Sequence, residues 1–455
     1  MNNHAINPLD GRYFDKTRTL APFFSEQALM KYRVMMEVEY LIALSALHKT
    51  ALRKFTLNEE KIIRNLYENF NDASYKEIKE EEAVTNHDVK AVEYFIKEKL
   101  SKTSLKDCIE WVHFGLTSED TNNISYALIL SDSLEKEIIP IISKIISELN
   151  TFAKKYKDLP MLARTHGQSA SPTTFGKEFK VFEERLKSQL SQLKNQKISA
   201  KINGATGNYN ALNIAYPKID WTNFSKNFIN SFNKIRTSKL APNLITTQIE
   251  PHDSYIELFD TLKRINYIMI DFNQDIWRYI SDGWVDQKTK EGEIGSSTMP
   301  HKINPIDFEN SEGNLGLANA LFEFYARKLP ISRLQRDLSD STVQRSFGTA
   351  FGHSYLAYIS LLKGLSKITV NEIKIKEDLM AHPEVITEAI QTILRREGIK
   401  MPYEKLKTLA RGKVLTLKDI HEFINTLEVS DKIKKELLKI TPENYTGLAG
   451  KLASK

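Results

Sequence analysis

The sequence predicts an all-α protein with an elongated central bundle of long helices, flanked by two smaller helical domains. Two observations lead to this prediction. Glycine occurs only 18 times and proline only 14 times among 455 residues, which disfavours a turn-rich β fold. In the middle of the chain, apolar residues recur at steps of three and four over long stretches, as they do in helices that bury one face.

Three apolar stripes define the longest predicted helices, over 134–156, 175–193 and 258–279. Each stripe places one apolar face along a helix, and that face must pack against other helices. Pro140 lies inside the first stripe. Because proline removes one backbone donor and clashes with the preceding turn, we expect Pro140 to kink this helix rather than end it.

Two further helices are expected over 307–325 and 343–365. The first is rich in small residues, which suggests that another backbone approaches it closely; these residues are Gly313, Gly316, Ala318 and Ala320.

The helix lengths suggest three consecutive domains. We expect an N-terminal helical domain over 1–110, a central bundle domain over 111–365 and a C-terminal helical domain over 366–455. A polar loop over 288–305 would belong to the central domain.

Composition narrows the classes of function. The formal net charge of +6 is small for this length and fits anionic small substrates at least as well as nucleic acid. The single cysteine, Cys108, excludes an internal disulfide and any cysteine-built metal site. No apolar run approaches the roughly 18 residues of a membrane span, and no signal-peptide pattern is evident. We therefore expect a soluble, cytoplasmic protein without nucleic-acid or membrane partners.

Motifs for cofactors and metals are weak. GATGNYN at 204–210 lacks the glycine spacing of a dinucleotide-binding loop, and HEFIN at 421–425 has one histidine where a zinc motif needs two. The ten histidines show no ligand spacing. We expect neither a cofactor nor a metal.

Polar groups crowd together in four segments at chain breaks. These are TNHDVK at 85–90, HFGLTSEDTNN at 113–123, RTHGQSASPTT at 164–174 and KTKEGEIGSSTMPHKINP at 288–305. The bland interpretation is helix capping for the second and third segments and a plain loop for the fourth. The functional interpretation is an active site, because loops on a rigid scaffold are where such groups concentrate.

These segments resemble a known family. GSSTMPHKINP resembles the signature loop of the fumarase/aspartase superfamily, and TSEDTNN and RTHGQ resemble its other two active-site segments, in the expected order. NPLDGRY, TNHDVKAVEYF, GNYNA, TTQIEPHD and the histidine before the loop lysine make the chain similar to bacterial-type adenylosuccinate lyases. The similarity extends from Asn7 to about Tyr445.

The resemblance implies a carbon–nitrogen lyase that releases fumarate by β-elimination. It implies that Ser296 is the general base and His166 the general acid, and that neither metal nor cofactor takes part. A serine hydroxyl is a weak base, so its surroundings must activate it, and Lys302 is a cation of the same loop. A histidine suits proton donation because its ordinary pKa lies near neutrality.

The resemblance also implies the groups that bind substrate. Thr117, Ser118, Lys302 and Asn304 would be donors to the reacting carboxylates. Arginines would clamp a phosphate through paired hydrogen bonds. The full implied binding set is Arg12, Tyr13, Asn86, His87, Asp88, Thr117, Ser118, Gln248, Lys302, Asn304, Asn310, Arg336, Ser341, Thr342, Val343, Gln344 and Arg345.

The expected activity is cleavage of adenylosuccinate to AMP and of the succinylcarboxamide imidazole ribotide (SAICAR) to its carboxamide (AICAR), in purine biosynthesis. A homotetramer with active sites shared between chains is also implied. Two alternatives stay open. One is another superfamily lyase, such as argininosuccinate lyase, which would not need a phosphate clamp. The other is a catalytically idle helical scaffold or a basic nucleic-acid binder.

Overall fold

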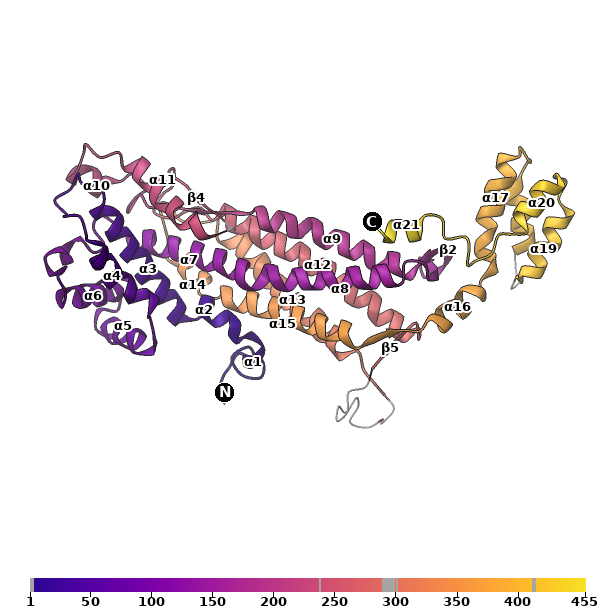
Figure 1. Ribbon diagram of the computed structural model, residues 1–455, viewed down its shortest axis with the longest axis horizontal. Coiled ribbons are helices and arrows are strands. Elements are labelled where there is room, and N and C mark those ends of the chain that lie inside the picture. Colours follow the sequence, from indigo (N-terminus) through magenta and orange to yellow (C-terminus); the bar gives the residue numbers. More distant parts are fainter. Residues whose placement is uncertain (1–3, 237–238, 289–298, 300–301, 411–414) are drawn as a thin grey trace. The chain divides into compact units, whose positions relative to one another are not determined.

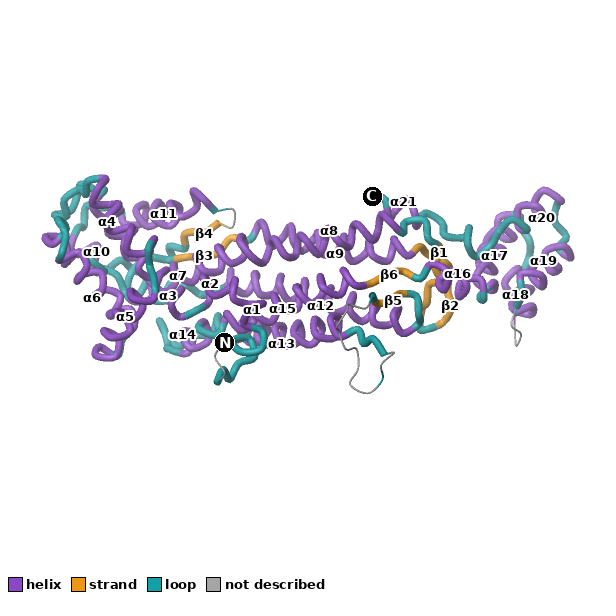
Figure 2. The backbone as a smooth tube through the Cα atoms, turned by 60° about the horizontal axis from the view of Figure 1, so that its bottom comes forward, coloured by secondary structure: helices purple, strands orange, loops and turns teal. Residues whose placement is uncertain are grey.

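The computed structural model describes residues 4–236, 239–288, 299, 302–410 and 415–455. The prediction of an all-α protein is confirmed: helices dominate, and the described strands form three two-stranded pairs (Figure 2). The apolar stripe predicted over 175–193 becomes part of the core, since its six defining residues are all buried: Phe175, Phe179, Phe182, Leu186, Leu190 and Leu193.

The chain divides into two compact units that alternate along the sequence. The first unit comprises 1–143, 189–267 and 313–359, and the second comprises 144–188, 268–312 and 360–455. The chain passes from one to the other within five helices: α8 (Ile139–Lys155), α9 (Phe175–Asn195), α12 (Asp253–Ser281), α13 (Ile306–Lys328) and α15 (Phe347–Lys367). The division into three consecutive domains stays a prediction.

The first unit carries the N-terminal helices, in which α3 and α7 pack side by side (Figure 1). Its parallel strands β3 and β4 pair Lys197 with Lys239 through Ala200 with Pro242. Besides segments of the helices already named, its elements are α1 (Phe14–Thr17), α2 (Ala21–Phe24), α3 (Glu26–Ser45), α4 (Leu57–Glu68), α5 (Asp72–Thr85), α6 (Asp88–Ser101), α7 (Ser118–Ser133), β3 (Lys197–Ala200), α10 (Asn210–Ala215), α11 (Trp221–Ser231), β4 (Lys239–Pro242) and α14 (Ser339–Gln344), together with short 3-10 helices.

The second unit carries an antiparallel hairpin and the C-terminal helices. Its strands pair as β1 with β2 and as β5 with β6, both antiparallel. Its elements are β1 (Pro160–Thr165), β2 (Gln168–Thr174), β5 (Val285–Gln287), β6 (Ile368–Val370), α16 (Glu372–Met380), α17 (Thr387–Arg396), α18 (Pro402–Ala410), α19 (Leu417–Thr426), α20 (Asp431–Leu437) and α21 (Ala449–Ala453).

The helix that contains Pro140 continues as predicted, whereas the helix predicted over 343–365 is broken. The helix continues through Pro140, and a π-helical turn over Leu134–Ile138 directly precedes α8. Such a turn is one way to accommodate a backbone position that lacks its donor. The helix predicted over 343–365 is instead divided: α14 ends at Gln344 and α15 begins at Phe347.

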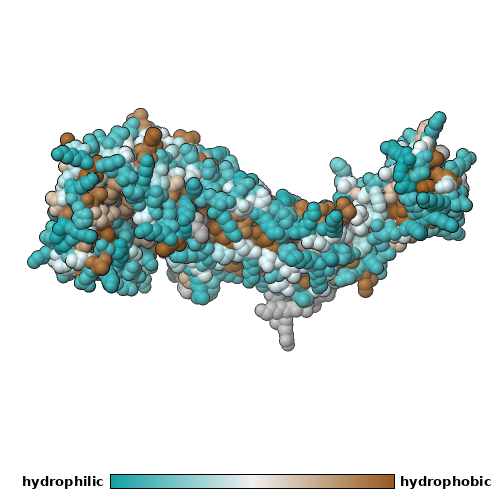
Figure 3. All heavy atoms as spheres, turned by 45° about the horizontal axis from the view of Figure 1, so that its top comes forward, coloured by the Kyte–Doolittle hydropathy of each residue, from teal (hydrophilic) through white to brown (hydrophobic). Residues whose placement is uncertain are grey.

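The described residues supply no close approach to α13 at its two glycines. A Cβ added at Gly313 or Gly316 would meet no atom of the described residues within 4 Å, and both glycines are exposed, whereas Ala318 is buried. Elsewhere apolar side chains lie interspersed among hydrophilic ones on the face that Figure 3 shows. None of the helices among the described residues is long and apolar enough to cross a membrane.

Candidate functional site

The segment before α7 begins that helix with a polar cap. Thr117 is the N-cap residue, and its backbone N–H donates to Asp120 Oδ2 at 3.0 Å. Asp120 Oδ1 also lies 2.9 Å from Lys201 Nζ and accepts from the Asn203 backbone at 3.0 Å. Both charged side chains are fully buried. The capping interpretation of this segment is therefore correct for Thr117 and Asp120, and it leaves Glu119 unexplained.

The segment between α5 and α6 carries His87 and leads to Asp88 at the start of α6. Asn86 ends α5 in the left-handed conformation, which asparagine tolerates better than most residues. His87 caps α6, because its Nδ1 accepts from the Lys90 backbone N–H at 3.2 Å. In the neutral ring the proton then resides on Nε2, so that this nitrogen remains a donor on a half-exposed side chain.

Asp88 is held by two arginines. Its Oδ2 accepts from Arg33 Nη2 at 2.7 Å and from Arg345 Nη2 at 2.6 Å. Burial alone would raise the pKa of Asp88, but the two guanidiniums hold it below its usual range. Two predicted binding residues, Asp88 and Arg345, are thus joined, and Arg345 also donates to Ser341 Oγ.

A second group of predicted residues surrounds Arg336. Its Nη1 donates to Gln248 Oε1 at 3.4 Å, and its Nη2 lies 3.0 Å from Glu119 Oε2. The buried Gln344 side chain lies 2.8 Å from His252 Nε2. Thr342 and Val343 lie between Ser341 and Gln344 on α14. Direct contacts in the first unit therefore join Asp88, Arg345 and Ser341 in one group, and Arg336 and Gln248 in another.

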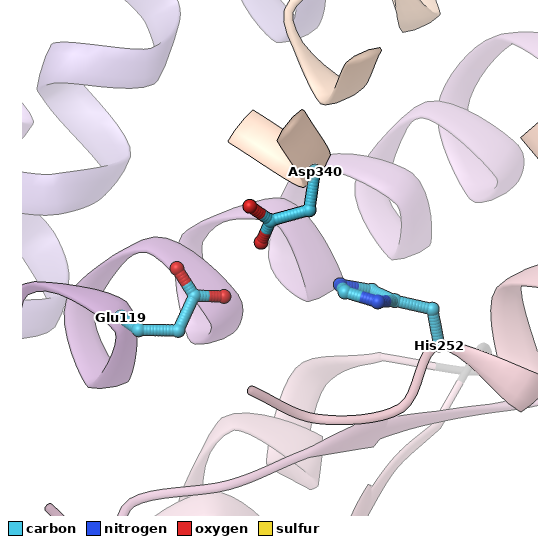
Figure 4. A group of neighbouring side chains, drawn as sticks. All are labelled: Glu119, His252 and Asp340. Carbon is cyan, nitrogen blue, oxygen red and sulfur yellow. The ribbon is translucent and has the colours of Figure 1, made fainter. Parts of the chain in front are cut away.

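Three buried titratable side chains meet beside Arg336: Glu119 from α7, His252 from the turn before α12 and Asp340 from α14 (Figure 4). Their potential ligand atoms all lie within 4.8 Å of one another. Burial, with help from Asp340 and against the opposing charge of Arg336, raises the pKa of Glu119 to about 7. Burial lowers the pKa of His252 to about 4, so its ring is neutral at pH 7. Carboxylates and imidazole are metal-ligand types, but here a guanidinium already supplies the cation.

His166 stands at the tip of the β1–β2 hairpin in the second unit. Thr165 pairs with Gln168, so the turn has two residues, and both have positive φ: 54° at His166 and 75° at Gly167. Such two-residue turns match the twist of a hairpin and project their side chains outward. His166 is exposed.

The polar loop over 288–305 is described only in part, and Ser296 lies outside the described residues. The Lys302 backbone N–H donates to Met299 at 3.1 Å, and Gln287 Nε2 donates to the Ile303 carbonyl at 3.0 Å. Asn304 follows in the same stretch, before α13. Asn310 lies on α13, where its Oδ1 accepts from Ser360 Oγ at 2.8 Å. Lys302, Asn304 and Asn310 thus belong, with His166, to the second unit.

The predicted binding residues Arg12 and Tyr13 lie in a folded turn of the first unit. The Tyr13 backbone N–H donates to Pro8 at 2.9 Å, and the Arg12 guanidinium lies 5.8 Å from the Tyr13 ring centroid. Leu9 packs on α15 so closely that a Cβ at Gly352 would come within 2.7 Å of it. The turn is therefore anchored, while Arg12 remains exposed.

Sequence reasoning did not assign a role to Arg33, Glu119, His252 or Asp340. Glu119 and His252 lie inside two of the family-like motifs, TSEDTNN and TTQIEPHD. Their position beside predicted binding residues was the only sign in the sequence that they lie at the site. Asp340 precedes the predicted binding residue Ser341. Arg33 lies inside α3 and has no local signal, because only packing brings it to Asp88.

Comparisons with known proteins agree with the expected family. A family model described as "Lyase" matches residues 11–319, and one described as "Adenylosuccinate lyase C-terminal" matches residues 332–446. The chain is 50% identical to the adenylosuccinate lyase of Haemophilus influenzae, over 99% of this chain and 98% of that one. It is 50% identical to that of Dictyostelium discoideum, over 98% and 97%. It is 47% identical to that of Escherichia coli, over 98% and 97%.

Solved structures share the fold at low sequence identity. The 3-carboxy-cis,cis-muconate lactonizing enzyme of Pseudomonas putida matches with a TM-score of 0.73 at 18% identity, covering 98% of each chain. A fumarate lyase from Mesorhizobium sp. BNC1 matches with a TM-score of 0.72 at 17% identity, covering 96% of each chain.

Proposed function

This chain belongs to the adenylosuccinate lyase family of the fumarase/aspartase superfamily, and from that premise we propose that it releases fumarate from adenylosuccinate to give AMP. We extend the proposal to SAICAR, which would give AICAR by the same elimination. Argininosuccinate lyase is not favoured, since full-length relatives at about half identity are adenylosuccinate lyases.

The placement of two arginines supports a nucleotide monophosphate as the class of substrate. In the first unit, Arg336 and Arg345 lie on a short segment around α14 and contact further predicted binding residues. A guanidinium binds phosphate oxygens through two parallel hydrogen bonds, which suits a nucleotide monophosphate. Arg345 is half-exposed, so it can turn from Asp88 toward an incoming anion.

The proposed reaction moves one proton off carbon and one onto nitrogen. Ser296, as base, takes a proton from the carbon next to a carboxylate. The electron pair of that C–H bond becomes the double bond of fumarate, while the C–N bond breaks and its electrons stay on nitrogen. His166, as acid, gives a proton to that nitrogen. General acid–base groups of this kind contribute roughly 10²–10⁴-fold each in rate.

The remaining predicted groups would stabilise negative charge. Abstraction of the proton places extra charge on a carboxylate, and donors aimed at that charge lower the barrier. Thr117, Ser118, Lys302 and Asn304 are assigned to this task. His87 supports it too, because capping α6 with Nδ1 leaves Nε2–H as a donor.

We also propose a homotetramer whose active sites combine residues from several chains. Support comes from the outer face of α13, which exposes small and apolar residues at helical spacing: Gly313, Gly316, Leu317, Ala320 and Phe324. An exposed apolar stripe of this kind is typical of a face that another chain covers. For a purine-biosynthetic enzyme, the proposed compartment is the cytoplasm.

The function is tested by measuring fumarate release from adenylosuccinate, SAICAR and argininosuccinate with the purified chain. We expect turnover of the first two only. Turnover of argininosuccinate, or of none of the three, would refute the assignment.

Matched arginine variants test the phosphate clamp. Arg345→Ala should raise the KM for adenylosuccinate about tenfold or more, because a charged hydrogen-bond partner is lost, and Arg345→Lys should recover part of that loss. Arg333→Ala is the control, since Arg333 lies in the same segment, is exposed and forms its ion pair with Asp337, which is not among the predicted binding residues. Equal effects of the two alanine variants would remove Arg345 from the clamp.

A further inference from the structure

Two buried carboxyl groups lie against one guanidinium in the first unit. Arg336 Nη2 is 3.0 Å from Glu119 Oε2, and Arg336 Nε is 3.5 Å from Asp340 Oδ1. The side chains of Glu119 and Asp340 are 1% and 4% exposed. Figure 4 shows the two carboxyls turned toward each other, with the His252 ring beside Asp340.

Among the described residues, several buried atoms of this cluster have no hydrogen-bond partner. They are Glu119 Oε1, both carboxylate oxygens of Asp340, Arg336 Nε and His252 Nδ1. Two carboxylates can only accept hydrogen bonds, so neither satisfies the other. One added proton turns one carboxyl into a donor, and an oxygen of the other carboxyl lies within 4.8 Å of it.

The charge balance leads to the same conclusion. His252 is neutral, as its lowered pKa requires. On the other sides, Lys201 is paired with Asp120, and Tyr126 and Tyr255 are uncharged phenols at neutral pH. The Arg336 guanidinium therefore faces two carboxyls whose side chains are almost completely buried. A second buried negative charge would be costly there, and one proton removes it.

We propose that Glu119 and Asp340 share one proton and together act as a positioning pair that holds Arg336 ready for the substrate phosphate. The proposal rests on the proposed function, because it assigns the pair to the nucleotide end of that site. Neither carboxyl is a catalytic residue, since both act through Arg336.

The shared proton makes substrate binding depend on pH. When it leaves, a second negative charge appears beside Arg336 and opposes the anionic phosphate. Since the pKa of Glu119 lies near 7, KM should rise as the pH increases above neutrality.

The first test uses infrared difference spectroscopy on the unliganded protein, so it does not depend on the proposed activity. At pH 6.5 the wild type should show the carbonyl band of a protonated carboxyl, which disappears as the pH rises. The band should be absent in Glu119→Gln, and in Asp340→Asn it should disappear at a lower pH than in the wild type, because Glu119 then keeps its burial but loses its like-charged neighbour. A band that disappears at the same pH in Asp340→Asn and in the wild type would overturn the proposal, since Glu119 would then be protonated by burial alone.

The second test compares the KM for adenylosuccinate across pH. Wild-type KM should rise roughly threefold to tenfold between about pH 6.5 and 8.5, and Glu119→Gln should show no such rise beyond the substrate's own titration. Glu257→Gln is the control, because it neutralises an exposed carboxylate of the same unit and should keep the wild-type profile. Superimposable profiles for wild type and Glu119→Gln would overturn the proposal.

A metal-binding arm separates a proton from a metal ion. Added Zn²⁺ should not be retained after dialysis, because Arg336 occupies the position of the cation. Stoichiometric retention that removes the carboxyl band would overturn the proposal. Absence of fumarate release with an intact infrared result would instead refute the proposed function and leave the proton pair standing.

Discussion

His87 and His166 are both histidines at chain breaks, yet each places its ring differently. His87 uses Nδ1 to cap α6, which fixes its tautomer and leaves Nε2–H facing outward. His166 stands at the tip of a two-residue turn, where the backbone holds the ring in solvent. The first arrangement suits a fixed donor, and the second suits an acid that must lose and regain a proton.

Replacing the proposed base tests the chemistry directly. Ser296→Ala should lower kcat roughly 10²–10⁴-fold, because a general base acts in the transition state. Substrate affinity should stay nearly unchanged, since the arginines supply most of it. Ser297→Ala is the control in the same loop. If Ser297→Ala lost turnover and Ser296→Ala kept it, the assignment of the base would be wrong.

His113 gives the protein a pH-dependent contribution to stability. Burial would lower its pKa, but the buried Glu37 carboxylate, 2.7 Å from His113 Nδ1, raises it above its ordinary value. The folded state therefore binds this proton more tightly than the unfolded state does. The stabilisation is fully present below the unfolded pKa of about 6.5 and is lost as the pH rises through the folded pKa.

The measurement is the midpoint of thermal unfolding for wild type and His113→Asn at several pH values. The wild type should exceed the variant most at about pH 5.5 and least at about pH 9. His48→Asn is a matched control, because His48 is exposed and has φ 52°, close to φ 61° at His113. A difference that is constant with pH would show that the ion pair does not contribute in this way.

At the scale of elements, helix ends and crossings place the functional groups. α9 begins directly after the hairpin that carries His166, and its start packs against the end of α8. A Cβ at Gly176 would lie 2.3 Å from the Ala153 carbonyl oxygen and 2.5 Å from the Lys157 backbone nitrogen. Because both neighbours are backbone atoms at the end of a helix, displacing either one would cost free energy.

Gly176→Ala should therefore destabilise the protein by about 1–3 kcal/mol, as overpacking typically does. The measurement is thermal and denaturant unfolding followed by circular dichroism. Ser188→Ala, at an exposed position of the same helix, should change stability by less than about 0.5 kcal/mol. A neutral effect of Gly176→Ala would mean that the two helices separate without cost.

At the scale of the whole molecule, assembly is the property that the single chain leaves open. The exposed stripe on α13 combines two glycines with Leu317 at 55% and Phe324 at 44% exposure. Gly313 and Gly316 have room for another backbone on their outer side, since no atom of the described residues would lie within 4 Å of a Cβ added at either glycine. This is the face at which we propose that a second copy of the chain packs.

Adding charge to this stripe should prevent assembly. Leu317→Glu combined with Phe324→Glu should give a smaller species in sedimentation velocity and should lower activity, because a charged residue buried in an interface is strongly unfavourable. Leu57→Glu, at a position 78% exposed on α4, is the control and should sediment like the wild type. An unchanged sedimentation coefficient in the double variant would exclude α13 from the interface.

Shared active sites predict complementation between two inactive variants. Ser296→Ala and His87→Ala should each be nearly inactive alone. If the two residues of one site come from different chains, subunit exchange should restore about a quarter of wild-type activity at equal mixing. Activity that stays at the variant level, with exchange verified by mass labels, would place Ser296 and His87 in one chain.

Much of the fold was predictable because helix formation is a local property. The stripe over 175–193 became α9, and all its apolar positions are buried. The sequence did not predict the break between α14 and α15, where Arg345 and Ser346 supply neither glycine nor proline. It also left open what approaches Gly313 and Gly316, since small residues on a helix look alike whether the chain itself or a second copy covers them.

The sequence by itself determined the helices, the chain breaks that carry polar groups, and the family. Only the tertiary structure decided which of those groups meet. Arg33, inside α3, reaches Asp88, and Glu119 of α7 faces Asp340 of α14. Helical periodicity specifies the face on which a side chain lies, whereas its partner depends on how distant elements pack. For that reason Glu119 was visible in sequence only as a neighbour of Thr117, and its contact with Arg336 became visible only in the folded chain.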